Sequence, residues 1–321
     1  MPEKLVFLDA ATLFPVPAED HFAPFRAFGS VTWHPTTLPE DVISRIADAT
    51  IVFTNKVVIG ASEIAAAPQL KLIQITATGT NNIDLPAAKE AGINVCNVGG
   101  YSTAAVTQHV FAMLLQIFTH TSDYNKDVRK VWPASPMFTR LDYPVMELAG
   151  KTLGIAGLGS IGSSVAKAGA GFGMKIVALG RDGARPSGDI PRLPREDFFS
   201  QADVITLHCP QTPETEKLIN AQTLEWMKPS AVLINTSRGG LVDEPALADA
   251  LKSGQIAAAG LDVLSVEPPQ ADHPLLAPDV PNLYLTPHTA WTSKEARATL
   301  LRTCAENVKS FLAGNVQNQV T

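Results

Sequence analysis

Three ionisable side chains, Arg238, Glu267 and His288, lie at or just after the ends of apolar segments in the second half of the chain. A guanidinium can hold a carboxylate and polarise a carbonyl, and an imidazole can donate a proton to an oxygen that gains charge. A carboxylate beside the imidazole would orient it and favour its protonated form. The three residues can therefore supply the groups that the reduction of a small 2-keto acid requires. We expect no metal ion, because Arg238 already supplies an electrophile.

A glycine-rich segment, residues 157–162, follows an apolar strand-like run and opens a helix-like one. Gly157 permits a tight turn, Gly159 lets a pyrophosphate approach the backbone, and Gly162 lets helix and strand pack closely. The start of a helix also attracts phosphate. The segment, with Ser160 and Ile161, therefore predicts a site for a dinucleotide cofactor.

The strand-like run 175–179 ends at Gly180 and Arg181, where an acidic residue would bind the ribose of NAD. With Arg185 close behind, this corner is cationic and suits the 2′-phosphate of NADP(H). In the alternative interpretation the arginines lie in a solvated loop and Asp182 binds the ribose of NAD. We expect NADP to be preferred and keep NAD as the alternative.

Short apolar runs bounded by turn residues alternate with helix-length stretches, which is typical of parallel α/β architecture. We expect two doubly wound parallel-sheet domains, a flavodoxin-like substrate domain and a Rossmann cofactor domain, with an active-site cleft between them. The expected strands are residues 4–9, 50–54, 70–76 and 93–97 in the first domain, and 152–157, 175–179, 203–208, 231–236, 257–262 and 282–286 in the second.

The substrate-binding domain is expected to be discontinuous, with residues 1–100 and 290–321 flanking a cofactor domain of residues 101–289. Helical spacing over 102–120 and 293–311 suggests two helices where the chain passes between the domains. Residues 123–148 contain Trp132 and three prolines and lack a sustained period, so we expect an irregular connection there.

The composition excludes several classes of protein. The 321 residues carry a formal charge of −6 without a cluster of Lys and Arg, so we expect no nucleic-acid partner. There is no apolar run of membrane-spanning length and no leader, which predicts a cytoplasmic protein without a membrane partner. Cys96, Cys209 and Cys304 lack the spacing of a zinc site or disulfide framework.

Residues 235–243, 261–268 and 286–288 resemble successive motifs of the D-isomer-specific 2-hydroxyacid dehydrogenase family, and the likeness spans nearly the whole chain. Residues 264–269 and 287–291 look most like its glycerate dehydrogenase, or hydroxypyruvate reductase, branch. This resemblance implies that hydroxypyruvate and glyoxylate are reduced to D-glycerate and glycolate. It also implies a homodimer formed through the cofactor domain. The alternative from another class is a dinucleotide-sensing scaffold of the corepressor type, without significant turnover.

The resemblance also implies roles for single residues. Arg238 and His288 bind the substrate, His288 is the acid/base and Glu267 is its partner. The other implied substrate residues are Thr78 and Gly79, whose backbone amides hold the substrate carboxylate, and Asn55, which lies with Lys56 on a second wall of the cleft. The other implied cofactor residues are Val106, which packs on the nicotinamide, Asp262 beside it, Thr236, and the adenine-side loop of His208, Cys209 and Pro210.

Overall fold

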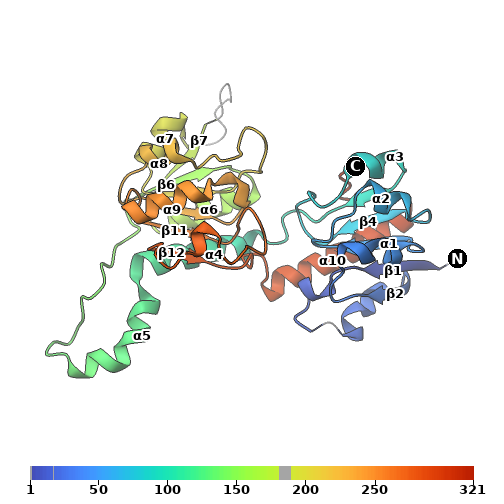
Figure 1. The fold of residues 1–321 in the computed structure, drawn as a ribbon, viewed down its shortest axis with the longest axis horizontal. Coiled ribbons are helices and arrows are strands. Elements are labelled where there is room, and N and C mark those ends of the chain that lie inside the picture. Colours follow the sequence, from blue (N-terminus) through green and yellow to red (C-terminus); the bar gives the residue numbers. More distant parts are fainter. Residues whose placement is uncertain (1, 17, 181–188) are drawn as a thin grey trace. The chain divides into compact units, whose positions relative to one another are not determined.

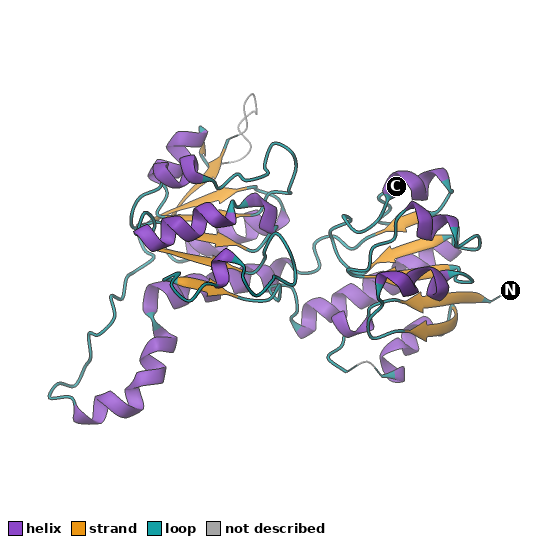
Figure 2. Cartoon of the chain, viewed as in Figure 1, coloured by secondary structure: helices purple, strands orange, loops and turns teal. Residues whose placement is uncertain are grey.

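The computed structural model describes residues 2–16, 18–180 and 189–321. The chain divides into two compact units (Figure 1). Unit 1 contains Met1–Tyr101 and Ser293–Thr321, and unit 2 contains Ser102–Thr292. The arrangement of helices and strands within each unit is shown in Figure 2.

Unit 1 is built on a five-stranded parallel sheet in the order β2-β1-β3-β4-β5, which is the flavodoxin-like order. One strand was not predicted, because it is a half-exposed edge strand whose apolar residues do not form a continuous run. The strands are β1 (Glu3–Phe7), β2 (Gly29–Trp33), β3 (Ile51–Thr54), β4 (Leu72–Ile75) and β5 (Asn94–Cys96). The helices are α1 (Val42–Ile46), α2 (Ala61–Ala65), α3 (Leu85–Glu90) and α10 (Lys294–Leu312).

Unit 2 contains a seven-stranded parallel sheet in the order β12-β11-β10-β9-β6-β7-β8. Counted from β6, this is the Rossmann order with one added strand, so the prediction of two doubly wound parallel sheets is confirmed. The strands are β6 (Thr152–Ala156), β7 (Lys175–Leu179), β8 (Arg192–Leu193), β9 (Val204–Leu207), β10 (Val232–Asn235), β11 (Ala258–Leu261) and β12 (Leu283–Leu285). The helices are α4 (Thr103–Thr119), α5 (Thr121–Val131), α6 (Ser160–Gly171), α7 (Arg195–Gln201), α8 (Ala221–Trp226) and α9 (Glu244–Ser253).

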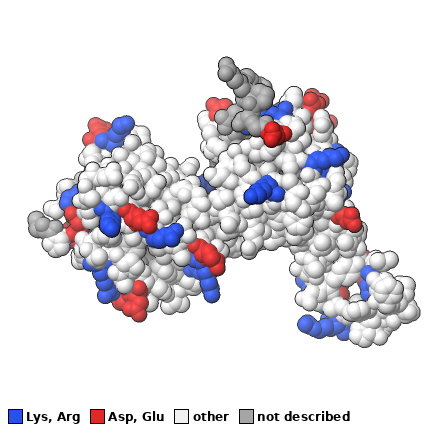
Figure 3. All heavy atoms as spheres, turned by 180° about the vertical axis from the view of Figure 1, so that it is seen from behind, with Lys and Arg blue, Asp and Glu red and all other residues white. Residues whose placement is uncertain are grey.

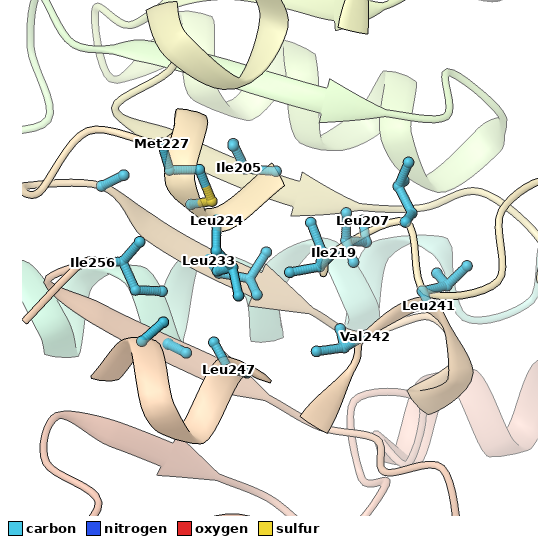
Figure 4. Close-up of a cluster of buried hydrophobic side chains, with 14 of the residues drawn as sticks. Ile205, Leu207, Ile219, Leu224, Met227, Leu233, Leu241, Val242, Leu247 and Ile256 are labelled. Atoms are coloured by element: carbon cyan, nitrogen blue, oxygen red, sulfur yellow. The ribbon is translucent and has the colours of Figure 1, made fainter. Parts of the chain in front are cut away.

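The core of unit 2 holds the strand ends from which the loops with the predicted site residues leave. Ile205 of β9 and Leu233 of β10 are fully buried, and they belong to one apolar cluster with Leu224 of α8 and Leu247 of α9 (Figure 4). Each such side chain stabilises the fold by about 1.5–3 kcal/mol through its burial. The loops after β9, β10 and β11 therefore start from a rigid edge.

The expectation of an irregular connection over residues 123–148 is wrong for its first part, because α5 spans Thr121–Val131. Tyr124, Val128 and Val131 recur at helical spacing, and an acidic first turn and basic last turn complement the helix dipole. Most residues of α5 are polar or charged, so the helical spacing of its few apolar residues is difficult to recognise in the sequence. Residues 135–151 contain neither helix nor strand. Within unit 2, α5 and this loop extend away from the sheet (Figure 1).

The surface charge is mixed. On the face drawn in Figure 3, Lys and Arg side chains are interspersed with Asp and Glu and do not gather into a basic surface. In the part of the chain that the structure describes, no helix has the length and apolar character that crossing a membrane requires. This face of the molecule lacks the continuous positive field that attracts nucleic acids.

Candidate active site

His288 and Glu267 are 21 residues apart in sequence, and the structure brings their side chains together. Nδ1 of His288 lies 2.6 Å from Oε2 of Glu267. An ionised carboxylate can only accept hydrogen bonds, so Nδ1 carries a proton and donates it. The tautomer and orientation of the ring are thereby set, and Nε2 becomes the nitrogen available for proton exchange.

Asp262 holds the loop that carries His288. Its carboxylate is 1% exposed. Its Oδ1 accepts hydrogen bonds from Oγ1 of Thr286 at 2.5 Å and from the backbone N of Thr289 at 2.8 Å. Its Oδ2 accepts from the backbone N of Ala290 at 2.9 Å. His288 itself has a left-handed φ of 54°, which the surrounding structure must maintain for a residue other than glycine. Asp262 therefore stabilises an unusual backbone conformation at His288.

Arg238 follows a tight turn at the end of β10. Asn235, whose side chain is fully buried, accepts from the backbone N of Ser237 at 3.0 Å through Oδ1 and donates to the carbonyl of Arg238 at 2.8 Å through Nδ2. The hydroxyl of Ser237 donates to the carbonyl of Cys209 at 2.8 Å. The guanidinium of Arg238 donates from Nη1 to the carbonyl of Ser237 at 2.7 Å. The turn is rigid, so the Arg238 side chain starts from a well-defined position.

The glycine-rich loop has the geometry that its sequence predicts for a phosphate site. Gly157 has a φ of 104°, and a Cβ atom there would lie 2.6 Å from the backbone N of Cys209. A Cβ on Gly162 would lie 1.9 Å from the carbonyl oxygen of Gly157. Gly159 is the N-cap of α6, and a Cβ there would meet no described atom within 4 Å. Open space in front of a helix N-terminus fits the pyrophosphate of a dinucleotide.

Thr236 adds a second sign of a ligand site at the edge of the sheet. Its Oγ1 is buried and has no hydrogen-bond partner among the described residues. A buried hydroxyl without a partner is costly, because it loses its bonds to water. Thr236 follows β10 and precedes Arg238, so a bound molecule at this edge could satisfy it.

The loop of residues 208–210 lies beside the glycine-rich loop, because Gly157 is in close contact with its backbone. Nε2 of His208 lies 2.9 Å from Oγ1 of Thr206. Burial lowers the pKa of His208 to about 4. At neutral pH the ring of His208 is therefore uncharged, which leaves it unsuited to the proton donation considered for His288.

Two other cofactor candidates lie on elements of unit 2. Val106 is on α4 and is 4% exposed. Gly180 directly follows β7, and its backbone N donates to the carbonyl of Leu193 at 2.8 Å. Arg181, together with Asp182 and Arg185, lies outside the described residues.

In unit 1, Asp9 anchors the loop after β3. Its carboxylate accepts hydrogen bonds from the backbone N of Asn55 at 2.9 Å and from the backbone N of Lys56 at 2.7 Å. Desolvation raises the pKa of Asp9, and these backbone bonds partly oppose the rise. The backbone at Asn55 and Lys56 is thus held from below the loop, at the carboxyl end of the sheet where ligands bind in doubly wound folds.

The neighbouring loop after β4 contains Thr78 and Gly79. Nδ2 of Asn55 donates to the carbonyl of Thr76 at 3.0 Å, which ties the two loops together. The hydroxyl of Thr78 donates to the carbonyl of Val98 at 2.8 Å. Oγ1 of Thr76 is buried and has no partner among the described residues. Asn55, Thr78 and Gly79 thus lie on two connected loops of unit 1.

The described residues form no metal centre, since no group of three or more His, Cys, Asp or Glu among them could hold an ion. The three cysteines are buried. Burial raises the pKa of Cys96 to about 11, and it also raises the pKa of Cys304. These two thiols are therefore protonated at neutral pH and weakly reactive.

Two histidines outside the predicted site residues, His109 and His273, have specific polar contacts. Nε2 of His109 lies 2.9 Å from Oγ1 of Thr286, which in turn binds Asp262. Nε2 of His273 lies 3.1 Å from Oε2 of Glu244, although the two residues are 29 positions apart. No local motif connects either pair, so periodicity and spacing could not have revealed them.

Comparison with known proteins gives consistent results for both units. Residues 111–290 match the family described as D-isomer specific 2-hydroxyacid dehydrogenase, NAD binding domain. A glycerate dehydrogenase from Methylorubrum extorquens is 42% identical over 322 residues, covering 100% of this chain and 99% of that protein. A hydroxypyruvate reductase from Blautia hydrogenotrophica is 39% identical over 323 residues, covering 99% of each. The sequence relationship therefore spans the whole chain.

Solved structures show the same relationship. An acyclic imino acid reductase in complex with NADPH and D-arginine has a TM-score of 0.87 at 30% identity, covering 99% of this chain and 100% of that one. A D-lactate dehydrogenase from Aquifex aeolicus, complexed with NAD and lactic acid, has a TM-score of 0.81 at 28% identity, covering 98% and 96%. Both dinucleotides thus occur among the structural relatives.

Proposed function

The chain belongs to the D-isomer-specific 2-hydroxyacid dehydrogenase family, a family of NAD(P)-dependent enzymes, and we propose that it reduces hydroxypyruvate and glyoxylate to D-glycerate and glycolate with NADPH. The observation that carries this proposal is the hydrogen bond between His288 and Glu267, because it prepares an imidazole for proton transfer. The choice of substrate is supported by the glycerate dehydrogenase and hydroxypyruvate reductase relatives, which match this chain over its full length.

His288 is the acid/base of the proposed reaction. In the direction of reduction, its protonated ring donates a proton from Nε2 to the oxygen on C2 of the keto acid. Glu267 keeps the ring oriented through Nδ1 and stabilises its positive charge. In the direction of oxidation, the neutral ring accepts the proton of the 2-hydroxyl group.

Arg238 binds the substrate. Its planar guanidinium can donate to the carboxylate and to the carbonyl oxygen at the same time, which polarises the C=O bond. The loops of unit 1 contribute Asn55 and the backbone N–H groups of Thr78 and Gly79, which suit a carboxylate. This assignment is supported by the hydrogen bond from Asn55 to the carbonyl of Thr76, which joins the two loops.

The cofactor residues of the proposal lie in unit 2. When bound, the reduced cofactor supplies the hydride that reaches C2. The pyrophosphate is held by the backbone of the glycine-rich loop, since the space before the helix N-terminus at Gly159 is open. The other proposed cofactor residues are Gly157, Ser160, Ile161, Gly162, Val106, Gly180, Arg181, Thr236, Asp262 and the loop of His208, Cys209 and Pro210.

We expect NADPH to give a higher kcat/KM than NADH, because the ribose-selecting corner contains Gly180 and Arg181 in place of an acidic residue. Arg181→Ala should weaken NADPH binding by roughly 1–3 kcal/mol, the contribution of one charge-assisted hydrogen bond, and leave NADH nearly unchanged. Initial rates and cofactor titrations with both dinucleotides measure this. A native preference for NADH would refute the role of Arg181.

The decisive experiment for the proposed function is a panel of 2-keto acids assayed with NADPH and NADH in parallel. Hydroxypyruvate and glyoxylate should give the highest kcat/KM, at rates typical of enzymes. Because one structural relative reduces imino acids, the panel is repeated with ammonium present. Tight cofactor binding without turnover of any keto acid would contradict the proposal and favour a dinucleotide-sensing scaffold.

Glu267→Gln should lower kcat for the reduction of hydroxypyruvate at least about 10-fold, because a neutral amide does not stabilise the positive charge of the ring that donates the proton. The measurement is kcat at saturating NADPH, with Glu225→Gln on the exposed surface of unit 2 as the control. A native kcat in Glu267→Gln would contradict the coupling between Glu267 and His288.

A homodimer through unit 2 is part of the same proposal. Large apolar side chains after α5 are solvent-exposed: Phe138 is 91% exposed and Leu141 is 83% exposed. Large apolar side chains that are exposed together in one loop suit an interaction site. A second copy of unit 2 is the partner that the family resemblance indicates.

A further inference from the structure

The loop that carries Glu267 is fastened by a buried carboxylate outside the proposed catalytic residues. Glu244 is the first residue of α9 and is 6% exposed. Its Oε1 accepts a hydrogen bond from the backbone N of Ser265 at 2.7 Å. Its Oε2 accepts from Oγ of Ser265 and lies 3.1 Å from Nε2 of His273. One carboxylate thus joins the start of α9 to two points in the following loops.

The protonation of this cluster follows from its contacts. The backbone N of Leu275 donates to Nδ1 of His273 at 3.2 Å, so Nδ1 is unprotonated and Nε2 carries the proton. His273 therefore donates to Glu244. The neighbouring charged pair is Lys217 and Asp243, at 3.1 Å. Three donors and the N-terminus of a ten-residue helix surround Glu244, which suits an ionised carboxylate and not an amide.

The backbone next to Ser265 forms a hydrogen bond with the side chain of Glu267. The residue before it, Leu264, donates its backbone N–H to Oε1 of Glu267 at 3.0 Å, while Oε2 binds His288. On the other side the loop backbone packs on Gly239, where a Cβ would lie 1.9 Å from the carbonyl carbon of Leu264. Residues 265–268 are exposed. This loop therefore depends on a few anchors near Ser265, and Glu244 binds Ser265 through two of its atoms.

We propose that Glu244 is a positioning residue: by fixing Ser265, it holds Glu267 where it can orient His288. The inference rests on the proposed function, because Glu244 acts only through Glu267 and His288. Without the anchor, Glu267 is displaced from Nδ1 in a larger fraction of the molecules. The loss falls on kcat, since displacement of a group that acts in the reaction slows the reaction step. Cofactor affinity is unaffected, because the glycine-rich loop is held by separate contacts.

Substitutions of Glu244 and Ser265, the two residues that form this contact, test the proposal. Glu244→Gln places an amide N–H₂ group among donors, and it should lower kcat for hydroxypyruvate about 10-fold with the Kd of NADPH within about 2-fold of native. Ser265→Ala, which loses only the hydroxyl bond, should lower kcat about 3-fold. Ser265→Thr keeps the hydroxyl and should restore kcat. If kcat in Ser265→Thr stays as low as in Ser265→Ala, the hydrogen bond from the Ser265 hydroxyl to Glu244 does not have the proposed role.

Asp243→Ala is the matched control, because Asp243 caps the same helix by accepting from the backbone N of Ala246 at 3.4 Å and pairs with Lys217, and alanine removes both contacts. It should lower the melting temperature without lowering kcat. If it lowers kcat as much as Glu244→Gln at an equal loss of melting temperature, general destabilisation explains the effect and the proposal is overturned.

A double-mutant cycle gives the readout that a purely structural role would not move. Glu244→Gln should cost about 10-fold in kcat in the native protein and less than about 2-fold in a Glu267→Gln background. Equal costs in both backgrounds overturn the positioning role. If Glu244→Gln does not fold, Ser265→Ala replaces it in the cycle. Native turnover by His288→Ala would refute the proposed function itself, whereas its loss combined with additive Glu244 and Glu267 effects refutes only the positioning role.

Discussion

Replacement of His288 by alanine is expected to slow the reduction of hydroxypyruvate by roughly 10²–10⁴-fold, the usual contribution of a positioned general acid. The proton would then have to come from water. NADPH affinity should change little, because the glycine-rich loop does not involve His288. Steady-state kcat with hydroxypyruvate and a fluorescence titration with NADPH measure the two quantities.

Two further variants separate proton transfer from backbone effects at this position. His288 has a left-handed φ, which asparagine tolerates better than alanine, so His288→Asn should keep the loop conformation and still lose activity. His34→Ala removes a half-buried histidine of unit 1 and should leave kcat near the native value. Native-like turnover by His288→Asn would show that the ring is not the proton donor.

The sequence predicted well the strands that are short apolar runs bounded by turn residues. β9 and β10 lie within one residue of their predicted limits, and β7 has the predicted limits. β2 and β8 were missed because an edge strand is half exposed and a two-residue strand is too short to show a pattern. α5 was missed because its short apolar stripe is set among charged residues.

The candidate site also has features that could be predicted from the sequence and contacts that could not. The glycine-rich loop is a contiguous segment, so its turn and its helix start could be predicted from residue types alone. Glu267 and His288 could be paired because they follow neighbouring parallel strands, whose ends meet at one edge of the sheet. The anchors below them could not be predicted: Glu244 and His273 meet through loop geometry, and no periodic pattern encodes their contact.

Arg238→Lys is expected to lower kcat/KM for hydroxypyruvate by about 10²-fold while leaving the Kd of NADPH within about 2-fold of native. Lysine keeps the positive charge but replaces a planar fork with a single ammonium group, so one of the two charge-assisted contacts to the keto acid is lost or misplaced. Such a contact contributes about 1.5–3 kcal/mol. Polarisation of the carbonyl matters in the transition state, so kcat should fall as well as substrate affinity.

The control for Arg238→Lys is Arg195→Lys, because Arg195 also donates to a backbone carbonyl, that of Leu218 at 3.2 Å, and lies on α7 of the same unit. Its kinetics should stay close to native. The backbone of residue 238 cannot shift to bring the lysine ammonium closer to the keto acid, since the turn that Asn235 closes keeps this backbone in place. If cofactor binding collapsed in Arg238→Lys while turnover at saturating cofactor survived, Arg238 would be a cofactor residue, and substrate binding would have to be assigned to another cation.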